Sequence, residues 1–129
     1  MLLRFVTADR DARTGQPKGL MTLAYQLLRS DDVLPTDEEQ LAGHVQWIES
    51  HLPVPRRFAR KKNVSHKHTH GISWLKPHAT EVLAHMYAVA DIAGKYGYHV
   101  QILRTDRPGY IVHEDDWQVV AEPFHGEGN

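Results

Sequence analysis

The sequence contains no cysteine, and this absence excludes several kinds of chemistry. A chain without thiols cannot form disulfides, use a thiolate nucleophile or build a cysteine-rich zinc site. It also lacks any apolar run close to the roughly 18 residues of a membrane helix, and its apolar N-terminus is too short for a signal peptide. We therefore expect a cytoplasmic protein that makes no contact with membranes.

Motifs for nucleophilic catalysis and nucleotide binding are also missing. None of the four serines stands in a Gly-x-Ser-x-Gly turn, and no cysteine is available to pair with a histidine. Residues 15–19 begin and end with glycine but lack the length and the final Gly-Lys-Ser/Thr of a phosphate-binding loop. The sequence thus favours binding over catalysis.

Neither sign of charge is in excess, since 15 Lys and Arg stand against 16 Asp and Glu. A protein that binds polyanions over its whole surface needs a global excess of cations, so any basic function here must be local. No Asp or Glu occurs between Glu49 and Glu81, whereas residues 56–76 hold seven Lys or Arg. We call residues 56–76 the basic segment.

The basic segment combines cations with two flat aromatic side chains, which is typical of surfaces that neutralise phosphates and stack bases. This pattern predicts contact with nucleic acid or a nucleic-acid-associated protein. Two other interpretations stay open: a merely solvated loop, or docking onto acidic groups of this chain or of an acidic protein partner, as in an interaction or inhibitor module. The predicted contact residues are Arg56, Arg57, Phe58, Arg60, Lys61, Lys62, Lys67, Trp74 and Lys76.

Three histidines alternate within the basic segment, at His66, His68 and His70. On extended backbone they would share one side and could converge on a metal ion, so a metal-dependent hydrolase is the enzyme alternative. However, a zinc site usually includes a nearby carboxylate, and here the neighbouring lysines repel a dication unless residues 114–116 approach. We expect no physiological cofactor, only opportunistic binding of zinc or nickel.

Other histidines lie on two predicted helices with the same spacing of seven residues. His44 and His51 flank Trp47, and His78 and His85 repeat the pattern further along. Histidines at a helix edge are usually half-buried packing residues, which is the interpretation we favour, and a strip that binds a partner is the alternative.

Composition and length predict one globular domain over residues 1–129, with a frayed tail at 124–129. Helical spacing of apolar residues predicts a helix at 20–28 and a second that starts with a capping box at Thr36 and Glu39 and stops before Pro53. It predicts a third helix with Pro77 in its first turn and Gly97 directly after its end. In the third helix we expect Met86 and Val89 to be buried.

Strand patterns occur at residues 2–7, 71–76, 98–104, 110–114 and 117–122, with turns at 106–109 and 115–116. The order β-α-α-β-α-β-β-β predicts an α+β fold: one mixed sheet of about five strands, three helices and a C-terminal antiparallel meander. We expect the carboxylates at 114–116 to be exposed at a hairpin tip and Trp117 to be a cross-strand aromatic.

Two stretches carry a resemblance, Ile72-Ser-Trp-Leu-Lys76 and Arg107-Pro-Gly-Tyr-Ile-Val112, the second continuing through residues 114–124. With them the chain resembles a group of small uncharacterised bacterial proteins of similar length. The resemblance implies a bacterial intracellular origin and supplies no activity, cofactor or catalytic residue.

Overall fold

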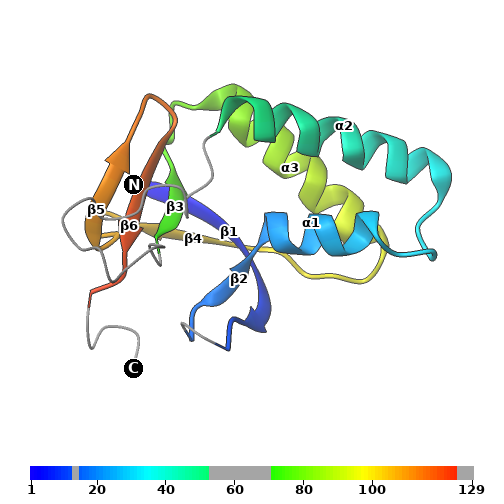
Figure 1. Ribbon diagram of the computed structural model, residues 1–129, viewed down its shortest axis with the longest axis horizontal. Helices are drawn as coiled ribbons and strands as arrows, with labels where there is room; N and C mark the ends of the chain where they lie inside the picture. The colour runs from blue at the N-terminus through cyan, green and yellow to red at the C-terminus, as the bar shows by residue number, and fades with distance from the viewer. Residues whose placement is uncertain (13–14, 53–70, 125–129) are drawn as a thin grey trace, which may run out of the picture.

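A computed structural model describes residues 1–12, 15–52 and 71–124 of the chain. Figure 1 shows the three helices gathered at one end of a curled sheet. The predicted α+β class and the order of the main elements are confirmed. The sequence reading omitted one short strand, β2. The elements are β1 Leu2–Arg10, β2 Pro17–Gly19, α1 Leu20–Leu28, α2 Pro35–His51, β3 Ile72–Leu75, α3 Thr80–Lys95, β4 Gln101–Thr105, β5 Tyr110–Glu114 and β6 Gln118–Glu122.

The sheet is organised around β1, which is nine residues long. One edge of β1 pairs with the whole of β4, from Leu2 opposite Thr105 to Val6 opposite Gln101. Its other edge is shared by β3, which pairs at Leu3, and β2, which pairs from Val6 to Arg10. The sheet continues from β3 to β6 and β5.

Two details of the predicted sheet are wrong. Every ladder of the described strands is antiparallel, so the sheet is not mixed. The last three strands do not form a meander, because β5 pairs with β6 while β4 pairs with β1. The long β1 offers a ladder along the whole length of β4, and β5 pairs with β6 alone among the described strands.

The helices follow the predicted apolar stripes, and α1 has the predicted range, but the starts of α2 and α3 differ from the prediction. The second helix has no capping box: Pro35 is its first residue, Leu34 is the N-cap, and no side chain caps it. Proline suits this position because a helix needs no N–H donor there. The third helix begins at Thr80, three residues after Pro77, and Gly97 follows its end with the predicted left-handed φ of +86°.

A buried carboxylate joins the start of α2 to the end of α3. Asp37 Oδ2 accepts a hydrogen bond from the Tyr96 hydroxyl at 2.6 Å, and its Oδ1 accepts one from Lys95 Nζ at 3.1 Å. The same hydroxyl accepts a hydrogen bond from the Leu34 N–H. These hydrogen bonds, led by the one from Tyr96, lower the pKa of Asp37.

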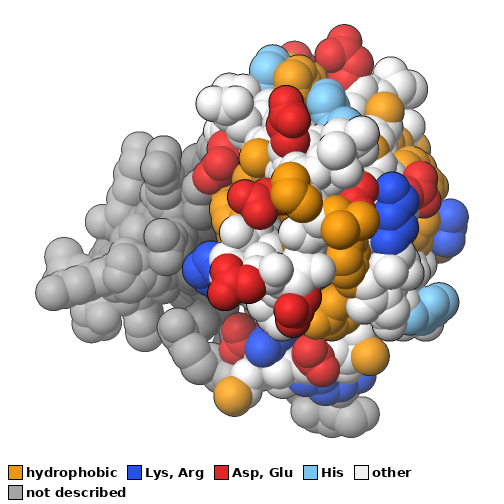
Figure 2. All heavy atoms as spheres, turned by 90° about the vertical axis from the view of Figure 1, so that its right-hand side faces the viewer, with side chains coloured by type: hydrophobic (Ala, Val, Ile, Leu, Met, Phe, Trp, Pro, Cys, Tyr) orange, Lys and Arg blue, Asp and Glu red, His pale blue; other side chains and the backbone are white. Residues whose placement is uncertain are grey.

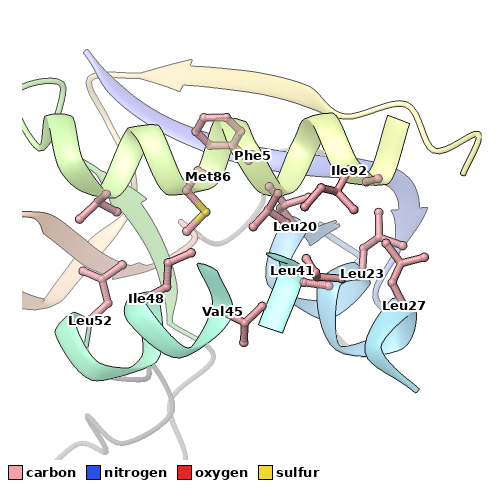
Figure 3. Packing of buried hydrophobic residues seen from close by; sticks show 14 of the residues in the cluster. Phe5, Leu20, Leu23, Leu27, Leu41, Val45, Ile48, Leu52, Met86 and Ile92 are labelled. Carbon is pink, nitrogen blue, oxygen red and sulfur yellow. The ribbon is translucent and has the colours of Figure 1, made fainter. Parts of the chain in front are cut away.

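The main hydrophobic core lies between the three helices and β1 (Figure 3). The prediction that Met86 and Val89 are buried is confirmed, with exposed fractions of 8% and 0%. No helix of the described residues is long and apolar enough to cross a membrane.

Candidate functional site

The two described residues that flank the stretch 53–70 line one cleft. Leu52, which caps the C-terminus of α2, and Gly71, which precedes β3, both line a cleft of about 300 Å³ between the helices and the sheet. Most of the predicted contact residues, and all three metal candidates, lie outside the described residues. These are Arg56, Arg57, Phe58, Arg60, Lys61, Lys62 and Lys67, together with His66, His68 and His70.

The two described contact residues, Trp74 and Lys76, are engaged within the fold. Trp74 is half-buried on β3 opposite Val119, and its indole N–H is buried with no hydrogen-bond partner in the structure described here. Lys76 Nζ lies 2.8 Å from Glu114 Oε2, so its charge is neutralised internally. Lys76 thus has an acidic partner within the chain, unlike what was expected of a free contact cation.

The hairpin tip at residues 114–116 is built by turn chemistry, as predicted, but Asp115 is less exposed than expected. Its carboxylate accepts hydrogen bonds from the backbone N–H groups of Trp117 and Gln118 and lies 2.9 Å from His113 Nε2. Burial raises the pKa of Asp115, but these hydrogen bonds outweigh it, and the net pKa is lowered. Within residues 1–12, 15–52 and 71–124, no group of three His, Asp or Glu side chains could hold a metal ion.

The helix-edge histidines form one cluster across α2 and α3. Trp47 stacks with both His51 and His85, with ring centroids 3.9 and 4.1 Å apart. His44 Nδ1 lies 2.8 Å from His85 Nδ1, a hydrogen bond that requires at least one neutral ring. We call His44, Trp47, His51 and His85 the imidazole–indole cluster.

The electrostatic environment of the cluster disfavours charge on His85. Burial is the main cause that lowers the pKa of His85, and His44 and His51 add to it against an opposing effect of Glu81. The cluster borders the β5–β6 hairpin, because the ring of Trp117 lies edge-on to the ring of His51, with centroids 6.5 Å apart. Trp117 itself is 38% exposed.

Sequence reasoning found the two histidine strips separately and did not predict that they meet. The available signal was the seven-residue spacing of His44 and His51, which places both on one face of α2. The prediction that His78 lies on the third helix is wrong, because α3 begins at Thr80. His78 departs from this pattern: its Nε2 lies 2.9 Å from the Asp116 carbonyl oxygen, so it joins the hairpin.

No family model, curated protein or solved structure matches this chain.

Proposed function

We propose that the protein acts in the cytoplasm as a non-catalytic binding protein whose basic segment contacts nucleic acid or a nucleic-acid-associated protein. The observation that carries the proposal is the separation of charge along the chain. The basic segment holds seven Lys or Arg and no acid, and the rest of the chain has eight cations against sixteen acids, a formal charge of −8.

This separation favours a directed contact. Phosphates attract the basic segment through release of their counterions, whereas an acidic body repels them from other faces. Figure 2 shows Asp and Glu side chains spread over one face of the molecule, with Lys and Arg side chains toward its right side and lower edge. Complementary charge of this kind orients a partner before contact is made.

The imidazole–indole cluster supports the same function. Its member His51 is the last residue of α2, five residues before the basic segment begins in the sequence. His51 and Trp117 are exposed, so two flat rings lie beside the C-terminal end of α2. Bases of single-stranded nucleic acid stack on such rings with little dependence on sequence.

The proposal is tested by titrating fluorescent single- and double-stranded DNA and RNA at about 50 mM salt, where phosphate contacts are strong. A variant with Ser at Arg57, Arg60, Lys61 and Lys62 should lose most of the affinity. A matched control has Ser at the exposed residues Arg10, Lys18, Arg29 and Arg104, which changes the net charge equally and should keep the affinity. Equal losses in both variants would contradict a local site.

Affinity should also rise as the pH falls through about 6.5, because protonation of His66, His68 and His70 adds positive charge to the segment. Absence of nucleic-acid binding in the parent protein would refute the nucleic-acid proposal and leave an acidic protein as the partner class.

Elemental analysis distinguishes the proposed binding protein from a metal-dependent hydrolase. The binding protein needs no metal. Tag-free protein purified without a nickel column should hold less than one equivalent of transition metal, and a chelator should not change its melting temperature. Stoichiometric metal that is lost together with stability in a His68→Ala variant would favour the hydrolase instead.

A further inference from the structure

The cleft beside the basic segment has a largely apolar wall built from every layer of the fold. Leu20, Ile48 and Met86, from α1, α2 and α3, all line the cleft, and Figure 3 shows Ile48 and Met86 directed toward each other. Phe5 on β1 and Leu75 on β3 complete the wall on the side of the sheet. A volume of about 300 Å³ is at the small end of ligand pockets, enough for a body of one or two rings.

Arg4 is the one Lys or Arg that lines the described part of this cleft. Its Nη2 donates a hydrogen bond to the Pro17 carbonyl oxygen at 2.8 Å, and no described carboxylate forms an ion pair with it. Burial lowers the pKa of Arg4 to about 10, so it remains charged at neutral pH. A guanidinium has five N–H donors, and most of those on Arg4 are left for a ligand.

The start of α1 adds positive potential beside the same guanidinium. A Cβ atom built on Gly19, the N-cap residue of α1, would lie 3.7 Å from Arg4 Nη2. The helix has no side-chain cap and no acid in its first turn, and its residues Leu20, Met21 and Thr22 line the cleft. Helix N-termini favour negative charge, so two positive features adjoin each other here.

The acidic residue of the lining is already engaged. Glu49 is exposed at the rim, and its Oε2 accepts a hydrogen bond from the Tyr25 hydroxyl at 2.8 Å. Burial, followed by the interaction with Glu49, raises the pKa of Tyr25 to about 12, which keeps this hydroxyl a donor. Glu49 remains charged but forms no ion pair with Arg4, so it is not the counter-anion of Arg4.

We propose that this cleft is a second binding site, for a small organic monoanion in which one carboxylate or sulfonate is attached to an apolar ring system. Arg4 binds the anionic group with charge-assisted hydrogen bonds, and the apolar wall binds the rings. The site does not depend on the basic segment for its charge.

The test compares two probes that share a skeleton, anilinonaphthalene sulfonate and its uncharged counterpart phenylnaphthylamine. The parent protein should bind the sulfonate about ten-fold more tightly, since a hydrogen bond to a charged group is worth more than about 1.4 kcal/mol. Arg4→Met should abolish this preference, and Arg4→Lys should retain part of it. Equal binding of both probes by the parent, or an unchanged preference in a folded Arg4→Met variant, would overturn the proposal.

Methionine methyl NMR of the parent protein locates the probe without relying on a variant. The methyl signals of Met21 and Met86, which line the cleft, should shift on adding the sulfonate, while that of Met1, which is 63% exposed, should not. Shifts confined to Met1, or none at all, would contradict the site. The variant with Ser at Arg57, Arg60, Lys61 and Lys62 should bind the sulfonate as the parent does, so loss of nucleic-acid binding leaves this result standing.

Discussion

Single buried positions carry much of the stability, and Val89 is the clearest of them. Its side chain is completely buried in the main core on α3. A Val89→Asp variant should lose about 4 kcal/mol or more of unfolding free energy, because it places an unpaired charge in the core. Chemical denaturation measures this loss. The matched Ala84→Asp variant, at an exposed position on the same helix, should change stability by only about 0.5 kcal/mol; similar effects of both would contradict the packing of α3.

Residue patterns predicted the core better than they predicted polar contacts. Apolar residues at helical spacing identify Met86 and Val89 without knowledge of their neighbours, since the period itself defines a buried face. By contrast, Thr36 and Glu39 match a capping box in sequence, but the helix starts earlier, at Pro35. The neighbouring Asp37 accepts hydrogen bonds from Tyr96 and Lys95, which the sequence did not indicate. The partners of Asp37 are almost sixty residues away, a separation that no local motif reveals.

At the level of elements, the turn between β4 and β5 depends on one glycine. Gly109 has a φ of +132°, and a Cβ atom there would overlap the backbone carbonyl group of Glu122. Gly109→Ala should destabilise the protein by about 2 kcal/mol or more through strain and steric overlap.

A glycine in a helix provides the control. Gly43 on α2 has nothing within 4 Å of a built Cβ atom, so Gly43→Ala should stabilise by about 0.5 to 1 kcal/mol. Thermal denaturation of the two variants tests this account of the turn. A Gly109→Ala variant as stable as the parent protein would contradict the positive φ and the close approach of Gly109 to Glu122.

The packing of α2 against α3 should depend on pH through the imidazole–indole cluster. The pKa of His85 is lower in the fold than in the unfolded chain, where it is about 6.5. Below that pH the unfolded state takes up the proton more readily, so stability falls as the pH falls from about 6.5 toward the lowered pKa. Above that range both states are neutral at His85 and the effect vanishes.

Melting temperatures between about pH 7.5 and 5 should therefore fall more steeply for the parent protein than for a His85→Gln variant. The difference between the two curves removes the contribution of the other histidines. Parallel curves would contradict the environment of His85 described above.

Local patterns predicted which elements form, because periodicity and turn residues act over a few positions. They did not predict the strand pairing, since the choice of β4 between β1 and β5 depends on which edges are free in space. The imidazole–indole cluster and the cleft around Arg4 were missed for the same reason, because their members come from separate elements.

The whole molecule is an acidic body that carries one basic segment, and this arrangement is the basis of the proposed function. The net charge of −1 does not reveal this arrangement, because the positive charge of the basic segment nearly equals the negative charge of the rest of the chain. Charge distribution along the chain was therefore the informative quantity, and the fold adds that Leu52 and Gly71, on either side of the stretch 53–70, line one cleft.

The salt dependence of nucleic-acid affinity tests this account most directly. Each phosphate contact contributes a slope of roughly 0.7 to 0.9 to the fall of log affinity with log salt concentration, so Ser at Arg57, Arg60, Lys61 and Lys62 should flatten the slope by about 3. The control with Ser at Arg10, Lys18, Arg29 and Arg104 should keep the slope of the parent. Equal slopes for the parent and the basic-segment variant, or equal flattening in the control, would contradict the claim that this segment is the binding surface.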